Sequence, residues 1–116
     1  MSISRLKGKK AEDVACNFLI QNGLSLVTRN FSCRYGEIDL IMQDSDTLVF
    51  VEVRYRQSNK FGMAAETIDN NKQRKLVFTA NYYLQKNPSP LATRFDVIAM
   101  SEKHPIEWIS NAFMEY

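Results

Sequence analysis

Hydrophobic and polar positions recur along the chain in two rhythms, one typical of helices and one typical of strands. Apolar residues return at helical spacing over residues 6–21, and Asn22-Gly23 follows as a stop signal. The same spacing predicts a second helix over residues 66–85, which Pro88 and Pro90 end because proline cannot continue a helix. Aromatic residues on this second helix, namely Phe78, Tyr82 and Tyr83, are predicted to be core packing and not platforms for base stacking.

Five other segments are rich in β-branched and aromatic residues and predict strands, at residues 24–28, 36–42, 48–54, 94–100 and 106–109. Residues 29–35 are polar and basic, and are predicted to be a connection. The turn at residues 43–47 is so short that its two flanking strands should form an antiparallel hairpin. The predicted order is α-β-β-β-α-β-β, an α/β chain with a mixed sheet flanked by helices. At 116 residues we expect one domain spanning residues 1–116.

Charge and the absence of hydrophobic runs narrow the classes of function. The net charge is only +2, but basic residues gather at residues 5–10, 54–60 and 72–75, which suits a polyanion such as nucleic acid; solvated surface charge is the alternative. The first residues carry no apolar segment of the kind found in signal peptides, so we expect none, and no apolar run approaches the length needed to span a bilayer. Two cysteines without a CxxC pattern fit a reduced compartment, so we expect a cytoplasmic protein without membrane contact.

Acidic residues inside apolar strands are the unusual feature of the sequence. Asp39 and Glu52 sit in runs that are otherwise hydrophobic, and Asp96 repeats the pattern. A buried carboxylate without a partner costs several kcal/mol, so such groups are normally paired, protonated or bound to a cation. Asp96 is interpreted as structural, paired either with Arg94 or with an arginine of a neighbouring strand.

The predicted hairpin brings Asp39 and Glu52 close together on neighbouring strands. Two carboxylates with room for water and phosphate describe a Mg²⁺ or Mn²⁺ site, and Arg54 would add a fixed positive charge. The alternative is an ion pair of either carboxylate with Arg54, Arg56 or Lys72, which would need no metal.

Several strings in the sequence match one family in order and spacing. They are residues 8–15, Gly36-Glu37-Ile38-Asp39-Leu40-Ile41, Phe50-Val51-Glu52-Val53-Arg54-Tyr55-Arg56, Phe61-Gly62, Lys72-Gln73 and Arg94-Phe95-Asp96-Val97. Over residues 6–113 the chain resembles the YraN family of small bacterial proteins. That family is similar to the restriction-endonuclease-like PD-(D/E)XK nucleases, including the archaeal Holliday junction resolvases.

The resemblance implies a Mg²⁺ or Mn²⁺ site formed by Asp39, Glu52 and the backbone carbonyl of Val53. Arg54 stands where those nucleases carry a lysine, and arginine is a poor general base because it keeps its proton. Lys72 could compensate, or it could be a surface residue at the start of a helix. Glu12 is, by analogy with the resolvases, a candidate third carboxylate; a solvated glutamate is the alternative.

The leading hypothesis is therefore a metal-dependent endonuclease that hydrolyses DNA, with branched or damaged DNA as candidate substrates. One rival is a nuclease fold that binds nucleic acid without cutting it, with Arg54 marking the lost activity. Another rival is an interaction protein in a DNA repair or uptake assembly. Symmetric cleavage of a four-way junction would need two active sites and hence a dimer, but the sequence marks no dimer face.

Overall fold

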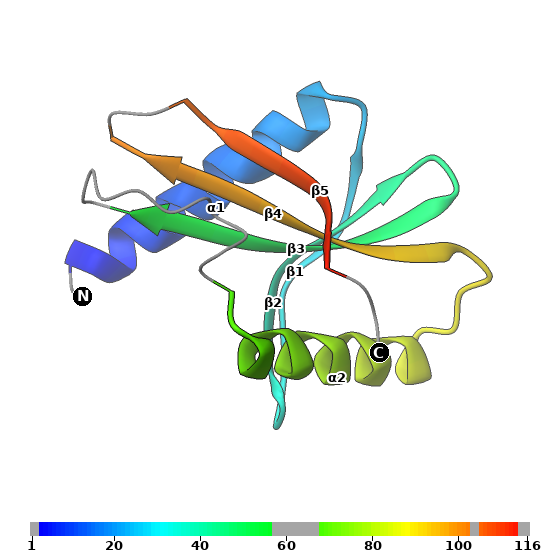
Figure 1. Ribbon diagram of the computed structural model, residues 1–116. Helices are drawn as coiled ribbons and strands as arrows, with labels where there is room; N and C mark the ends of the chain where they lie inside the picture. Colours follow the sequence, from blue (N-terminus) through cyan, green and yellow to red (C-terminus); the bar gives the residue numbers. More distant parts are fainter. Residues whose placement is uncertain (1–2, 57–67, 103–104, 114–116) are drawn as a thin grey trace.

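Five strands and two helices make up the computed structural model, which describes residues 3–56, 68–102 and 105–113 (Figure 1). Along the chain the elements are α1 (Ile3–Gln21), β1 (Ser25–Cys33), β2 (Gly36–Asp44), β3 (Thr47–Arg56), α2 (Asn70–Lys86), β4 (Ala92–Ser101) and β5 (Glu107–Phe113). The mixed α/β architecture predicted from the sequence is confirmed. None of the helices described is long and apolar enough to cross a membrane.

The strands form one sheet in the order β1-β2-β3-β4-β5. The pairs β1–β2, β2–β3 and β4–β5 are antiparallel, whereas β3 and β4 are parallel, so the expected hairpin at residues 43–47 is present. Parallel neighbours need a crossover connection, and α2 lies within it. The central strand β3 is therefore shared by an antiparallel hairpin and a parallel unit.

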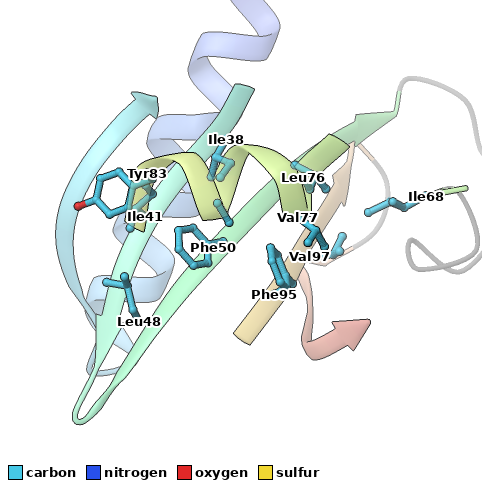
Figure 2. Packing of buried hydrophobic residues seen from close by; sticks show 11 residues of the cluster. Ile38, Ile41, Leu48, Phe50, Ile68, Leu76, Val77, Tyr83, Phe95 and Val97 are labelled. Carbon is cyan, nitrogen blue, oxygen red and sulfur yellow. The ribbon is translucent and has the colours of Figure 1, made fainter. Parts of the chain in front are cut away.

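Each face of the sheet is covered by one helix (Figure 1). On one face, Ala15, Cys16 and Leu19 of α1 pack against apolar residues of β2, β3 and β4, among them Leu40 and Val51. On the other face, α2 packs against a second cluster drawn from the same strands, shown in Figure 2. Burial on both faces explains why these strands are apolar at nearly every position.

The prediction of a connection at residues 29–35 is wrong, because β1 continues to Cys33. Its register with β2 shifts between Leu26 and Thr28, and Asn30 adopts a positive φ of 53°. An edge strand is stabilised by backbone pairing on one side, so it tolerates polar side chains that hide its period. Phe31 is its inward anchor, with its ring centroid 5.1 Å from that of Tyr83.

The second helix begins at Asn70, four residues later than the predicted start at residue 66. Asp69 has an extended conformation, and its side chain accepts a hydrogen bond of 2.8 Å from the backbone N–H of Lys72. This is an N-cap, which fixes where the helix starts. The first helix ends at Gln21 as predicted, but it begins at Ile3 and not at residue 6.

The prediction that the aromatic residues of α2 are core packing holds for only one of the three. Tyr83 is buried against the sheet (Figure 2), and Tyr82 is half-buried. The Phe78 side chain is 53% exposed. The prediction is wrong for Phe78, because helical spacing does not indicate how wide the buried face of a helix is.

Candidate metal and nucleic-acid site

The candidate site lies where β2 and β3 stop pairing. Their antiparallel register runs from Asp44↔Thr47 to Leu40↔Val51, and one further step would put Asp39 opposite Glu52. At this step β3 stays paired with β4, whereas the ladder between β2 and β3 has ended. The two carboxylates, called here the carboxylate pair, therefore face each other at a fork in the sheet.

The alternation of side chains along β2 also breaks at Asp39. Ile38 and Ile41 both pack in the cluster beneath α2, although residues three apart on a regular strand face opposite sides. Leu40 packs in the cluster beneath α1. The backbone of β2 therefore turns locally at Asp39, which is also where β2 stops pairing with β3.

The environment of Asp39 disfavours its negative charge. Burial is the largest cause that raises its pKa, the neighbouring Glu52 is the second, and together they bring the pKa of Asp39 to about 7. The backbone N–H of Val53 and the charge of Lys72 act in the opposite direction. The hydrogen bond from Val53 and the charge of Lys72 are therefore too weak to offset the effects of burial and of Glu52 on Asp39.

Val53 connects the two strands at the fork through its backbone. Its N–H, no longer used by a ladder with β2, donates a hydrogen bond of 2.8 Å to Oδ2 of Asp39. In an extended strand the N–H and C=O of one residue point to the same side. The carbonyl of Val53 therefore lies on the side of β3 that faces Asp39.

Two cations approach Glu52, whose side chain is only 7% exposed. Nζ of Lys72 lies 3.3 Å from Oε2 of Glu52, and Nη1 of Arg54 lies 3.8 Å from the same oxygen. The ion-pair alternative considered from the sequence is therefore realised for Glu52. Lys72 belongs to the site and not only to the surface, because its nitrogen reaches inward from the first turn of α2.

Glu12 reaches the edge of this arrangement from α1. Burial and the charge of Asp39 raise the pKa of Glu12, and Arg29 lowers it from 3.7 Å away. When the amide of Asn30 is oriented to donate, its nitrogen lies 2.9 Å from Glu12 and 3.0 Å from Glu37. Glu12 is thus a partly buried acid near Asp39, held by side chains of β1.

The donor set at the fork fits a small divalent cation with few protein ligands. Two carboxylates and one backbone carbonyl are oxygen ligands, and Mg²⁺ commonly binds one or two carboxylates while keeping several waters. The raised pKa of Asp39 means that added positive charge would be stabilising there. Within residues 3–56, 68–102 and 105–113, however, no three His, Cys, Asp or Glu side chains form a group that could hold a metal.

Asp96, the third acid in an apolar strand, is fully provided with hydrogen-bond donors. It accepts from Nε of Arg94 at 3.1 Å, from Nε1 of Trp108 at 2.9 Å and from the backbone N–H of Asn111 at 2.8 Å. Arg94 in turn pairs with Asp44 at 3.0 Å. The structural interpretation of Asp96 and its pairing with Arg94 is confirmed, and the cluster ties β5 to β4.

Two residues of the site were underrated by sequence reasoning, although each carried a signal. A lysine in the first turn of a helix is disfavoured by the helix dipole, so Lys72 at that position indicates another partner. Asn30 is one of the few residue types that tolerate a positive φ, and an asparagine within a polar strand is compatible with such a bend. In the basic cluster at residues 54–60, Lys60 lies outside the described residues, as does the side chain of Arg56, and so does Phe61 of the family resemblance.

Comparisons with known proteins identify relatives along the whole chain. The profile of an uncharacterised protein family, UPF0102, matches residues 11–100. A UPF0102 protein of Nitrosomonas eutropha is 50% identical over 115 residues, which cover 99% of either chain. One from Psychromonas ingrahamii is 47% identical over 99% of this chain and 95% of its own, and one from Pseudomonas putida is 46% identical over 91% of each. These matches confirm the resemblance to the YraN family.

Proposed function

The chain belongs to the UPF0102 family, and from its carboxylate pair we propose that it is a divalent-metal-dependent endonuclease acting on DNA. The observation that carries the proposal is the placement of the half-buried Asp39 against the buried Glu52 at the fork between β2 and β3, with the pKa of Asp39 raised to about 7. Buried groups with strongly shifted pKa values cluster at functional sites. The mixed sheet with a helix on each face supports, at the finer level, a restriction-endonuclease-like fold.

Asp39, Glu52 and the carbonyl of Val53 would hold Mg²⁺ or Mn²⁺. When bound, such a cation lowers the pKa of a water and offsets the charge of a scissile phosphate. Glu12, on α1, would lie beside the metal site, where its charge acts on Asp39, and would not be a third ligand in this arrangement.

The basic residues of the site would orient the Glu52 carboxylate and neutralise charge on the bound phosphate. The ammonium group of Lys72, 3.3 Å from Glu52, holds that carboxylate in place. Because arginine is a poor general base, the guanidinium group of Arg54 would bind a phosphate oxygen in the transition state and would not remove a proton from water. Branched or damaged DNA are the candidate substrates that the resemblance to junction resolvases suggests.

A binding module without turnover is the second candidate. It is favoured by one observation, that both cations at the site already neutralise Glu52, with Arg54 in place of the lysine expected from related nucleases. Such a protein would bind DNA through its basic residues, and affinity would fall steeply as salt is raised.

The test is cleavage of single-stranded, duplex and branched DNA with Mg²⁺ or Mn²⁺. Metal binding is measured in parallel, as the rise in the thermal unfolding temperature when the metal is added. We expect Asp39→Ala and Glu52→Ala to lower the cleavage rate by roughly 100- to 1,000-fold, the range seen when one preorganised electrostatic group is removed. Asp46→Ala, in the exposed turn between β2 and β3, is the matched control and should cut normally. A wild-type protein that is stabilised by metal but cuts no substrate would replace the endonuclease with the binding module.

A further inference from the structure

The second helix carries an unusual charge distribution. Over Asn70–Lys86 it has four basic residues, Lys72, Arg74, Lys75 and Lys86, and no acidic residue. A protein surface normally intersperses both signs, so a helix with one sign alone creates a positive field along its length. The complementary ligand is a polyanion.

Exposed aromatic rings lie on the same side of this helix. Phe78 is 53% exposed, and Tyr35, from the turn between β1 and β2, lies with its ring centroid 5.6 Å from that of Phe78 at an interplanar angle of 34°. This turn lies close to α2, as the space at Gly36 shows: a Cβ atom placed there would lie only 3.4 Å from Oγ1 of Thr79. One turn further along α2, the half-buried Tyr82 packs against Phe31 of β1, with 6.1 Å between the two ring centroids.

Two of these rings already have a cation over them. The guanidinium carbon of Arg34 lies 5.0 Å from the centroid of Tyr35, and Nζ of Lys86 lies 5.2 Å from the centroid of Tyr82. We call the group formed by Arg34, Tyr35, Lys75, Phe78, Tyr82 and Lys86 the aromatic-basic surface. Rings for stacking together with cations for phosphates are what sequence-tolerant single-strand binders present.

We propose that the aromatic-basic surface binds single-stranded nucleic acid, with unstacked bases on Phe78 and Tyr35 and phosphates on the flanking cations. Duplex nucleic acid would use only the cations, because its bases are stacked inside the helix. A protein partner fits the surface less well, since lysine is depleted at the cores of protein interfaces.

The surface continues into the carboxylate pair along a single helix. Lys72, Lys75, Phe78, Tyr82 and Lys86 follow one another at spacings of three and four residues, so they lie on one side of α2. Phe78 is about 9 Å along the helix axis from Lys72, which contacts Glu52. This inference deepens the proposed nuclease function and rests on it for the cleavage step. The surface would hold the single-stranded arm of a branched substrate a few nucleotides away from the carboxylate pair.

Binding is tested without cleavage, by fluorescence anisotropy of the full chain in EDTA with a labelled 20-nucleotide single strand. DNA and RNA of the same sequence, and the matching duplex, are separate arms. We expect Phe78→Ala to weaken single-strand binding roughly 5- to 100-fold and duplex binding less than about twofold. Phe78→Trp should restore it. Ile20→Ala, which removes an equally exposed apolar side chain from α1, is the control and should bind as wild type.

Two outcomes would overturn the proposal. One is equal binding of single strand and duplex with no effect of Phe78→Ala. The other is self-association in sedimentation that Phe78→Ala abolishes while single-strand affinity is unchanged, which would make the surface an interface between copies. A protein that binds single strands through Phe78 but never cuts DNA would refute the nuclease and leave this surface standing.

Discussion

Two regions of the sheet each place an acid within an apolar strand, the buried Asp96 and the half-buried Asp39, and the two acids are compensated differently. At Asp96 the carboxylate receives hydrogen bonds from Arg94, Trp108 and the backbone of Asn111. At the fork, Asp39 receives one backbone hydrogen bond and faces a second acid, Glu52. The first acid is matched by donors, whereas the pKa of the second rises to about 7 because burial and Glu52 outweigh its donors.

The difference separates an acid whose charge is matched by donors from one whose charge is not. A buried charge that is fully compensated stabilises the chain segments that supply its donors, and here it holds β5 against β4. A carboxylate with too few donors costs stability when it is ionised, and this agrees with the proposed role of Asp39 in binding a cation. Sequence alone gives both acids the same pattern, one acid within a run of apolar residues.

The sharpest way to break the comparison is Asp96→Ala. It would leave the indole N–H of Trp108, the backbone N–H of Asn111 and the Nε–H of Arg94 without their acceptor, while Arg94 would keep its ion pair with Asp44. We expect the free energy of unfolding to fall by roughly 3–5 kcal/mol in urea denaturation. Because this change could prevent folding altogether, Asp96→Asn, which keeps one acceptor oxygen, is the milder companion, with a loss of about 1–2 kcal/mol. A loss no larger than that of Asp39→Ala would remove the distinction.

The second prediction concerns the pH dependence of stability. Because the folded protein holds the proton of Asp39 more tightly than the unfolded chain, with a pKa of about 7 against an ordinary 3.8, its stabilising contribution is complete below pH 4. It is lost as the pH rises through 7. Without divalent metal, this part of the free energy of unfolding should fall by about 2–4 kcal/mol between pH 4 and pH 8.

The measurement is urea denaturation across that pH range for wild type and Asp39→Asn. The variant cannot titrate at this position, so the difference between the two curves isolates Asp39. Asp46→Asn, at an exposed turn, serves as the control and should follow wild type. Parallel curves for wild type and Asp39→Asn would mean that Asp39 is as well compensated as Asp96.

The third and smallest effect is expected from Arg54→Lys. If the fork is catalytic, a lysine beside Glu52 can lose its proton and assist a water, so the cleavage rate should rise about tenfold. The gain should be largest above neutral pH, and the rate should therefore be followed from pH 6 to pH 9. Lys72→Arg is the reciprocal control, since it moves arginine's permanent charge to the helix and should not raise the rate.

Much of the architecture could be predicted from the sequence, and what failed has physical reasons. The periods of α1 and of the buried strands are regular because one face, or both, is apolar. The edge strand β1 has no such period, since it is stabilised mainly by backbone pairing with β2 and less by burial of its side chains. The start of α2 depended on the hydrogen bond between Asp69 and the N–H of Lys72, which hydrophobic spacing does not encode.

The site was predictable as far as residue types and strand register reach. Asp39 and Glu52 could be placed together because a hairpin with a short turn has few registers. Lys72 was beyond that argument, because its approach to Glu52 depends on how α2 crosses the sheet. The exposure of Phe78 depended on the width of the helix face that the sheet covers, which also is a property of packing.

The cap of α2 has a consequence for how such a chain can change over generations. Lys72 is held at its backbone by Asp69 and reaches Glu52 with its side chain, so one residue fixes the helix start to the sheet. Substitutions at Asp69 would therefore act on the carboxylate pair as well as on the helix start, because Lys72 joins the two.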